Sequence, residues 1–475
     1  MKTITTQYIN GNFVDSRGKE TLDLINPSNK QVIGRVTLGN EEDTRAAIRA
    51  AKEAFKTYSQ STLEERSRYL QQLHDAISAR TDEHIASRIE EYGGVSGHSR
   101  ASVAAAAKLF LNMKKSLSEV PFHKKLGQSE VLLKPVGVTG LITPWNSAIF
   151  MICNKVAPAL AAGCTVVIKP SELSALQTLL LAECFDAAGL PPGVINVVNG
   201  LGDVVGHELT THPDIAKVSF TGSTAVGKSI MRNAAETIKR VTLELGGKSA
   251  HIILDDADLA KAVPFSLAAG FMNNGQACIA GTRVLVPEHR LAEVKSAFLK
   301  AVPAFKVGYP SNAATVIGPL VSEKQYLRVQ NYIRKGIEEG AEVLIGGEGH
   351  PEGLESGYFV KPTIFVNVSN DMTIAREEIF GPILAVITYK TEEEAIQIAN
   401  DSIYGLQGWI STADEKRGKE IADRIEAGIV MVNQLYDLYD DAGVPAGGFK
   451  QSGIGREFGV YGIEEYLQTQ AVFSK

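Results

Sequence analysis

One cysteine of this chain has surroundings that suit a nucleophile. Cys278 follows a Gly275-Gln-Ala turn, which itself follows an apolar run from Ala262 to Phe271. This order predicts a helix whose end places a thiol in a crevice. A thiolate is a strong nucleophile, so the thiol can react if its surroundings lower its pKa and admit a substrate. Free cysteines are also common as buried, unreactive small hydrophobes, so residue type alone leaves both roles open.

A carboxylate and an amide have settings that suit the same chemistry. Glu244 lies inside the apolar, glycine-rich turn Leu243-Glu-Leu-Gly-Gly247. Burial raises the pKa of a carboxyl group toward the working pH of a general base, and an unpaired buried carboxylate is rare. Glu244 is therefore expected either to be paired or to transfer protons. Asn146 follows Pro144-Trp145 at a predicted strand end, where its amide and a backbone N–H can form an oxyanion hole.

Three segments have the composition of nucleotide-binding turns. Lys169-Pro-Ser-Glu172 supplies a donor and an acceptor for ribose hydroxyls, and its carboxylate favours NAD because it repels the extra phosphate of NADP. A solvated ion pair is the alternative for this segment. Phe220-Thr-Gly-Ser223 leads into a predicted helix, with Ser223 or Thr221 as N-cap, and the helix N–H groups there suit a pyrophosphate. The glycines of Gly200-Leu-Gly202-Asp-Val-Val-Gly206 miss the dinucleotide fingerprint by one residue and are weak evidence.

The apolar pattern places these segments at the ends of strands. Residues 41–120 show apolar positions recurring at three and four and are expected to be mostly helical. After them, strands alternate with helices, which predicts right-handed crossovers and a mostly parallel sheet whose ligands bind at the carboxyl ends of the strands. The expected strands of this first unit are 136–142, 165–168, 194–198 and 217–220, with a helix at 175–188.

A second α/β unit is expected between about residues 246 and 434. Its predicted strands are 250–254, 283–286, 341–345, 364–366 and 383–389, and its predicted helices are 323–339 and 392–400. Further strands are expected in a hairpin around Asn10-Gly11, at 127–135, where the strand would pair elsewhere in the molecule, and at 468–473 near the C-terminus.

Length and composition are those of an ordinary globular protein of two or three domains, at 475 residues, 44% hydrophobic and 21% charged. The net charge of −6, with no long run of Lys or Arg, argues against a nucleic-acid partner. Four cysteines without a C-x-x-C pair (Cys153, Cys164, Cys184 and Cys278) argue against a disulfide framework or a zinc site, so no metal is expected. We expect reduced thiols, no signal peptide, no membrane-spanning segment and a cytoplasmic location.

Taken together, these segments resemble the NAD(P)-dependent aldehyde dehydrogenase superfamily over essentially the whole chain. Seven motifs stand in the family's order: Pro144-Trp-Asn146, Lys169-Pro-Ser-Glu172, Phe220-Thr-Gly-Ser223, Leu243-Glu-Leu-Gly-Gly247, Gly275-Gln-Ala-Cys278, Glu378-Ile-Phe-Gly-Pro382 and Gly447-Gly-Phe-Lys-Gln-Ser-Gly453. The resemblance implies an α/β fold with a Rossmann-type cofactor domain (1–126 and 136–245), an α/β catalytic domain (246–445) and a small β oligomerisation arm (127–135 and 460–475). The arm would join subunits as a homodimer or homotetramer.

The resemblance implies NAD-dependent oxidation of an aldehyde to the carboxylic acid. Cys278 would attack the aldehyde carbon, while the Asn146 amide and the Cys278 backbone N–H hold the oxyanion. After hydride transfer to the nicotinamide, Glu244 would activate the water that hydrolyses the thioester. NAD is the expected cofactor, and NADP use is left open because some relatives turn the equivalent of Glu172 aside. The residues implied to contact the cofactor are Thr143, Pro144, Trp145, Lys169, Ser171, Glu172, Gly202, Phe220, Gly222, Ser223, Gly246, Glu378 and Phe380.

A substrate tunnel is implied as well, lined by Ser147, Met151, Asn154, Met272, Ala277 and Ile279. Aromatic residues are common in parts of that tunnel in relatives, and many relatives have Phe in place of Ala446. We therefore expect a roomier tunnel that accepts extended or bulky aliphatic aldehydes. The acidic loop Tyr436–Asp441 near the expected mouth supplies no Arg and argues against a substrate with a terminal carboxylate, although a backbone nest or a distant Lys could bind one.

Two other functions remain open. CoA-acylating relatives pass the acyl group to CoA instead of water, but they generally lack a glutamate at the position of Glu244. A non-catalytic structural or binding protein on the same fold would typically lose the nucleophile, whereas Cys278, Glu244 and Asn146 are all present. The sequence does not identify the physiological aldehyde.

Overall fold

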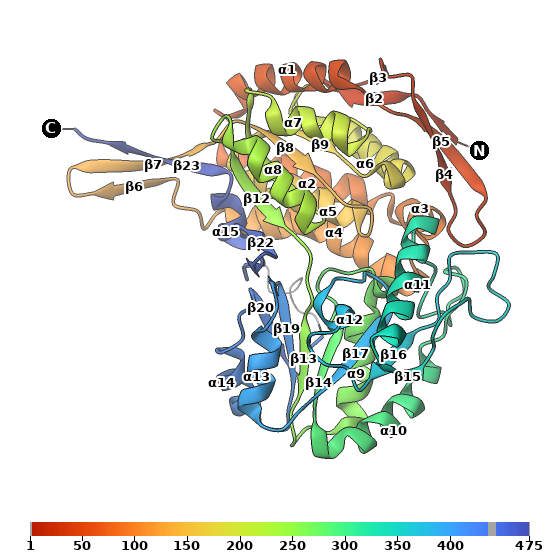
Figure 1. Cartoon of the computed structure of the whole chain (residues 1–475). Helices are drawn as coiled ribbons and strands as arrows, with labels where there is room; N and C mark the ends of the chain where they lie inside the picture. The colour runs from red at the N-terminus through yellow and green to blue at the C-terminus, as the bar shows by residue number, and fades with distance from the viewer. Residues whose placement is uncertain (1, 436–442, 475) are drawn as a thin grey trace.

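The computed structural model describes residues 2–435 and 443–474, which form two α/β units and a projecting β arm (Figure 1). The N-terminal half of the chain builds the first unit and most of the C-terminal half builds the second (Figure 1). The arm extends from the first unit, and the C-terminus lies along it (Figure 1).

The first unit is built on an eight-stranded sheet. Its strands are β2 (Thr6–Ile9), β3 (Asn12–Asp15), β8 (Val138–Ile142), β9 (Thr165–Lys169), β10 (Ile195–Val197), β11 (Ile215–Thr221), β12 (Arg240–Glu244) and β22 (Gly453–Ile454). They lie in the order β22-β12-β11-β8-β9-β10-β2-β3. The strands from β12 to β10 run parallel, and the strands at the two edges of the sheet are antiparallel to their neighbours.

Helices cover this sheet and provide most of its core. They are α1 (Glu41–Tyr58), α2 (Leu63–Ser78), α3 (Thr81–Tyr92), α4 (Ser96–Leu117), α5 (Ala148–Ala162), α6 (Ala175–Ala187), α7 (His207–Thr211), α8 (Thr224–Ala235) and α15 (Gly459–Glu464). Helix α5 is buried along almost its whole length between α2, α4 and the sheet. This enclosure explains why its sequence is apolar on every face, as expected for a core helix.

The second unit has a seven-stranded sheet. Its strands are β13 (Ala250–Ile253), β14 (Arg283–Pro287), β15 (Glu342–Ile345), β16 (Thr363–Val366), β17 (Ile383–Tyr389), β19 (Gln407–Ser411) and β20 (Ile429–Val432), in the order β15-β16-β17-β14-β13-β19-β20. All neighbours are parallel except β15, an antiparallel edge strand. The helices are α9 (Leu259–Phe271), α10 (Leu291–Ala301), α11 (Glu323–Glu338), α12 (Thr373–Arg376), α13 (Glu392–Asn400) and α14 (Glu415–Ala422).

Three small sheets complete the structure. The arm consists of β6 (His123–Leu126), β7 (Ser129–Pro135) and β23 (Leu467–Val472), all antiparallel, in the order β23-β7-β6. A second sheet near the N-terminus joins β1 (Lys2–Ile4), β5 (Val32–Thr37) and β4 (Thr21–Ile25). The third sheet pairs β18 (Tyr404–Gly405) with β21 (Phe449–Lys450).

The expected α/β class, the mostly parallel sheets and the Asn10-Gly11 hairpin are confirmed. The strand expected at 127–135 is present as β7 and pairs with the distant β23, but the first strand of its hairpin, β6, was not predicted. The strand His123–Leu126 is exposed and polar, so no apolar pattern marked it. Strands β12, β19 and β20 were also missed, because such short segments have no decisive period.

All four cysteines are free thiols, and Cys153, Cys164 and Cys184 are buried. Among the described residues, no helix is both long and apolar enough to cross a membrane.

Candidate active site

The carboxyl ends of four neighbouring strands carry the predicted site residues. Strands β12, β11, β8 and β9 are parallel and adjacent, so their carboxyl ends share one edge of the sheet. Glu244 ends β12, Thr221 ends β11, Thr143 follows β8 and Lys169 ends β9. A groove of about 620 Å³ opens at this edge. Ten of the residues predicted to contact the cofactor line this groove: Thr143, Pro144, Trp145, Lys169, Ser171, Glu172, Gly202, Phe220, Gly222 and Ser223.

An ion pair lies in this groove. The Lys169 ammonium is 3.1 Å from the Glu172 carboxylate, and the Lys169 side chain is only 6% exposed. The pair is therefore held against the groove wall, unlike the fully solvated loop pair that was its alternative. Ser171 lies between the two, and its hydroxyl accepts a hydrogen bond from the Leu173 N–H at 3.3 Å, which starts a short 3-10 helix.

Two helical N-termini border the groove. Ser223 is the N-cap of α8, and its hydroxyl accepts a hydrogen bond from the Val226 N–H at 3.4 Å. Gly222 lies so close to the Phe220 ring that a Cβ there would be 2.3 Å from a ring carbon, so the turn requires glycine. Gly202 opens a π-helical turn that ends at Gly206. The weak glycine pattern thus coincides with a real turn at the groove.

A second hollow of about 210 Å³ continues from the groove and contains the thiol. Both hollows are lined by Pro144, Trp145, Thr221, Gly222 and Ser223, and the second adds Asn146, Met151, Leu245, Gly246, Cys278, Gln325, Arg328, Glu378 and Phe380. The remaining predicted cofactor residues, Gly246, Glu378 and Phe380, are in this set. The hollow that contains the candidate nucleophile is therefore connected to the groove lined by the predicted cofactor residues.

Cys278 is half-buried and reaches the hollow from a tight loop after α9. Burial, together with the nearby carboxylates of Glu378 and Glu244, raises the pKa of its thiol to about 12. Hydrogen bonds from the N–H groups of Cys278 and Ile279 act in the opposite direction. In the free protein the thiol is therefore protonated at neutral pH.

The Asn146 side chain is buried beside this loop. Its amide nitrogen donates to the carbonyl oxygen of Gln276 at 2.9 Å, and the backbone carbonyl of Asn146 accepts from the Asn273 amide at 2.8 Å. A primary amide has two N–H groups, and the bond to Gln276 uses one of them. The amide is thus fixed next to Cys278 with a donor to spare.

Glu244 has the environment of a proton acceptor. Burial raises the pKa of its carboxyl group well above the ordinary value, and the nearby Glu457 carboxylate adds to the rise. Its Oε1 has no hydrogen-bond partner among the described residues. Behind it, the buried Lys155 ammonium is 2.6 Å from Glu457 Oε1. Lys155 therefore pairs with Glu457, and it is Oε1 of Glu244 that is left without a partner among the described residues.

Glu378 and two aromatic rings form the junction between the hollows. Glu378 Oε1 accepts a hydrogen bond from the Gly247 N–H at 3.1 Å, and burial raises the pKa of its carboxyl group. A Cβ on Gly246 would lie 2.6 Å from Glu378 Oε2, so glycine is required for this approach. The Trp145 and Phe380 rings meet edge to face at 5.4 Å. This segment therefore contributes a carboxylate and an aromatic ring to the hollow that contains Cys278.

Two residues of this hollow were not anticipated from the sequence. Gln325 donates to the Phe380 carbonyl at 2.7 Å, and Arg328 donates to the Glu378 carbonyl at 2.6 Å. Both lie on α11, where a polar face following the Ser322 N-cap is the available sequence signal. They fix the backbone that presents Glu378 and Phe380.

The structure brings only some of the predicted tunnel residues to the hollow that contains Cys278. Among the described residues, the hollow with Cys278 includes Met151 but not Ser147, Asn154, Met272, Ala277 or Ile279. Asn154 is buried and donates to Glu457, so its amide nitrogen serves that carboxylate. The acidic loop Tyr436–Asp441 lies outside the described residues.

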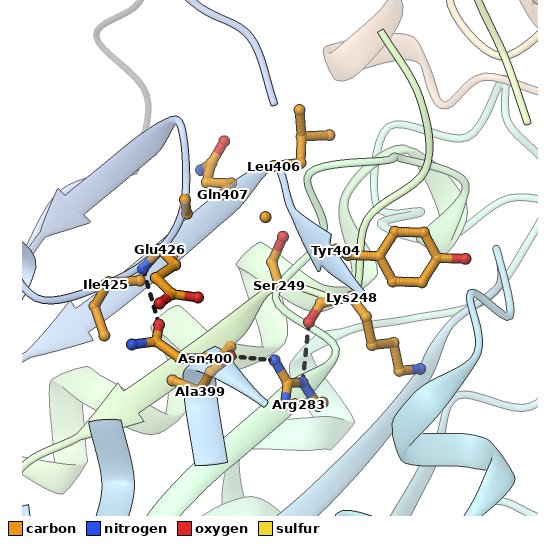
Figure 2. Close-up of a pocket in the computed structure, with 14 residues that line it drawn as sticks. Lys248, Ser249, Arg283, Ala399, Asn400, Tyr404, Leu406, Gln407, Ile425 and Glu426 are labelled. Carbon is orange, nitrogen blue, oxygen red and sulfur yellow. Dashed lines mark hydrogen bonds between the residues drawn. The ribbon is translucent and has the colours of Figure 1, made fainter. Parts of the chain in front are cut away.

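A separate small cavity of about 20 Å³ is lined by Lys248, Ser249 and Arg283 among others (Figure 2). Lys248 and Ser249 reach it from the turn that follows Glu244, and Arg283 donates to the Lys248 carbonyl at 3.0 Å and to the Ala399 carbonyl at 2.8 Å (Figure 2). Arg283 thus ties the turn to the second unit.

Comparisons with known proteins agree with this geometry. The model of the aldehyde dehydrogenase family matches residues 13–472. A putative aldehyde dehydrogenase of Staphylococcus aureus strain USA300 is 44% identical over 477 residues, 99% of each chain. A mutant of aldehyde dehydrogenase C from Pseudomonas syringae, solved with NAD+ and octanal, superposes with a TM-score of 0.96 at 43% identity, over 98% of this chain and 96% of that one. An NAD+ complex of an aldehyde dehydrogenase from Mycobacterium tuberculosis gives a TM-score of 0.97 at 41% identity, over 100% and 99%. The chain therefore belongs to the aldehyde dehydrogenase family.

Proposed function

We propose that this protein oxidises an aldehyde to the carboxylic acid with NAD, through a thiohemiacetal and a thioester on Cys278. The observation that carries the proposal is a thiol and a fixed amide, Cys278 and Asn146, in one hollow that continues into a nucleotide-sized groove. Glu244 lies close enough to raise the pKa of the thiol through its charge.

The chemistry of the groove fits NAD. Lys169 and Glu172 offer a donor and an acceptor for one ribose, and the N-terminus of α8 at Ser223 offers N–H groups to a pyrophosphate. Glu378 offers an acceptor for the second ribose, beside the flat face of Phe380. NAD supplies the hydride acceptor when bound. The Glu172 carboxylate favours NAD, and NADP remains a slower alternative in this proposal.

The proposed reaction has two halves, the first carried by Cys278 and Asn146, which line the hollow, and the second by Glu244, which ends β12 next to Leu245 of the lining. In the first, the Cys278 thiol gives its proton to solvent water, its sulfur bonds to the carbonyl carbon, and the carbonyl π electrons move to the oxygen, which the Asn146 amide stabilises. Collapse of this oxyanion breaks the C–H bond and leaves a thioester, and NAD held in the groove would accept the hydride on its nicotinamide. In the second half, Glu244 takes a proton from water, whose oxygen attacks the thioester carbon and releases the acid and the thiolate. The raised pKa of Glu244 suits proton transfer near neutral pH.

The substrate we propose is an extended aliphatic aldehyde. Met151, an apolar and adaptable side chain, lines the hollow beside Cys278. The Pseudomonas syringae relative was solved with octanal, a linear aldehyde of this kind. The proposed entry path passes Met151, which is the one of the six tunnel residues predicted from the sequence that lines this hollow among the described residues.

Subunit assembly is proposed through the arm. The outer strand β23 is exposed from Gln468 to Val472, and an exposed strand edge is a template for pairing with another chain. We propose that residues 127–135 and 460–475, with β6, form the oligomerisation arm of a cytoplasmic homodimer or homotetramer. We further propose that 1–126 and 136–245 form the cofactor domain and 246–445 the catalytic domain.

One experiment separates this function from its alternatives. NADH formation from octanal should proceed without CoA in the wild-type protein and vanish in Cys278→Ser. An absolute requirement for CoA would favour the acylating reaction, which the presence of Glu244 opposes. Full turnover by Cys278→Ser would overturn the assignment, and no turnover by the wild-type protein on any aldehyde would favour a non-catalytic role.

A further inference from the structure

A tyrosine of the first unit reaches across to the loop that carries Cys278. Tyr92 is the last residue of α3 and is fully buried. Its hydroxyl donates to the Asn273 carbonyl at 3.0 Å and accepts from the Gln276 side-chain amide at 3.1 Å. The hydroxyl therefore bridges the two ends of the turn that directly precedes the nucleophile.

That turn has a backbone that needs external support. Asn273 and Asn274 have φ angles of 50° and 63°, and Gly275 follows at 73°. Left-handed backbone at non-glycine residues is unfavourable and persists only where the surroundings impose it. Arg88, one turn before Tyr92 on α3, supplies a second contact by donating to the Asn273 side-chain oxygen at 2.8 Å. Helix α3 thus holds the turn at two places.

The same turn also fixes the oxyanion donor. The Gln276 carbonyl accepts hydrogen bonds from the Asn146 amide at 2.9 Å and from the Asn273 amide at 3.2 Å. A shift of Gln276 would therefore move the Asn146 amide together with the thiol two residues downstream. Nucleophile and donor are coupled through one residue, which Tyr92 holds.

We propose that Tyr92 is a positioning residue for the reaction, whose hydroxyl sets the direction in which the loop presents Cys278 and the Asn146 amide to the aldehyde. This inference rests on the proposed role of Cys278 as nucleophile. Tyr92 acts through Gln276 and has no part in the proposed bond-making steps.

The test compares two tyrosine-to-phenylalanine variants that differ in the position of the lost hydroxyl. Tyr92→Phe keeps the ring, including its contact with Trp145 at 6.2 Å, and removes the bridge. Tyr58→Phe is the matched control, because Tyr58 is also fully buried and its hydroxyl donates to the Leu160 carbonyl at 3.2 Å, in the core of the first unit. Both variants lose a buried hydroxyl, so a purely structural effect should appear in both.

Two readouts distinguish positioning from stability. The first readout compares kcat with octanal and KM for NAD. Tyr92→Phe should lower kcat about tenfold and leave KM unchanged, because a small misplacement of reacting groups lowers the rate by a large factor. The second is the rate of alkylation by iodoacetamide in the absence of substrate. Because the other three cysteines are buried, this rate reports Cys278, and it should change severalfold in Tyr92→Phe only.

The inference would be overturned if Tyr92→Phe had the same kcat and the same alkylation rate as the wild-type protein. It would also be overturned if Tyr92→Phe and Tyr58→Phe lost kcat to the same extent, in proportion to the fall in their melting temperatures. Cys278→Ser separates this result from a failure of the proposed function. If Cys278→Ser is inactive and Tyr92→Phe is normal, only the positioning role fails. If Cys278→Ser is fully active, the proposed function fails as well.

Discussion

The side-chain amide of Asn146 donates a hydrogen bond to the carbonyl oxygen of Gln276 at 2.9 Å, two residues before Cys278. This bond fixes the plane of the amide before any substrate arrives and leaves its second N–H available. A preorganised donor stabilises a developing oxyanion without reorganisation during the reaction. The pair thereby links the position of the donor to that of the nucleophile.

Removing this donor should slow the reaction without preventing cofactor binding. Asn146→Ala is expected to lower kcat by about 10²- to 10³-fold, the usual effect of losing one oxyanion donor. NAD affinity, measured by fluorescence titration, should stay within about twofold, since no ribose or pyrophosphate contact is assigned to Asn146. An unchanged kcat would remove Asn146 from the oxyanion site.

Removing the carboxylate should block the second half of the reaction. Glu244→Gln is expected to release a burst of about one NADH per subunit and then turn over about 10²- to 10⁴-fold more slowly, because no base activates water. Stopped-flow absorbance measures both phases. Glu91→Gln is a control, since Glu91 is a buried acid whose pKa is raised to about 7 but which lies outside the described hollows of the site and instead accepts from the Leu176 and Gln177 N–H groups. Loss of the burst in Glu244→Gln would place the carboxylate in the first half instead.

Reactivity of the thiol should rise with pH. Burial and nearby carboxylates raise the pKa of Cys278 to about 12, so the thiolate fraction in the free protein is small at neutral pH and grows about tenfold per pH unit below that value. The rate of iodoacetamide alkylation should follow this slope from neutral to alkaline pH. At alkaline pH, Glu378→Gln should increase the rate at fixed pH, because it removes a negative charge that raises the pKa of the thiol. A plateau below about pH 8 would show that the pKa is ordinary or lowered.

Cofactor choice should depend on the carboxylate beside Lys169. Glu172→Gln keeps the size of the side chain and removes the charge that repels a 2′-phosphate. The ratio of kcat/KM for NADP to that for NAD should rise about tenfold or more. Steady-state kinetics with both cofactors provides the measurement. An unchanged ratio would mean that Glu172 does not face the ribose.

The turn that follows Glu244 should depend on Arg283 for stability. Arg283 is buried and donates to the Lys248, Ile398 and Ala399 carbonyls. Figure 2 shows its bonds to Lys248 and Ala399. Arg283→Met leaves these acceptors unpaired and should lower the free energy of unfolding by about 3–5 kcal/mol. Thermal unfolding tests this, with Arg100→Met as control, since that arginine side chain is 66% exposed. Equal melting temperatures for the two variants would contradict it.

The sequence could predict the strand ends and the residues on them. Lys169 and Asn146 follow predicted strands, and parallel strands bring their carboxyl ends to one edge, so local patterns were sufficient to group these two, whereas Glu244 was recognised only from its glycine-rich turn. The helix before Cys278 ends at Phe271 as expected, and Ser223 is the N-cap of α8.

The support for these residues could not be predicted in the same way. Tyr92 and Gln276 are 184 positions apart, and their hydrogen bond depends on how α3 packs against the second unit. Likewise, no feature of the neighbouring sequence indicates that the Asn154 amide would donate a hydrogen bond to Glu457, 303 positions away. The tunnel prediction suffered from this, because it treated Asn154 as a side chain free to face a substrate.

The central claim is the covalent thioester on Cys278. The most direct measurement is mass spectrometry of the Glu244→Gln variant after mixing with NAD and octanal, followed by protease digestion at acidic pH. The account predicts one octanoyl group on the peptide that contains Cys278, formed together with the NADH burst and absent when Cys278 is also replaced by Ser. NADH formation at the same burst amplitude with no acyl group on that peptide, or with the group on another residue, would contradict it.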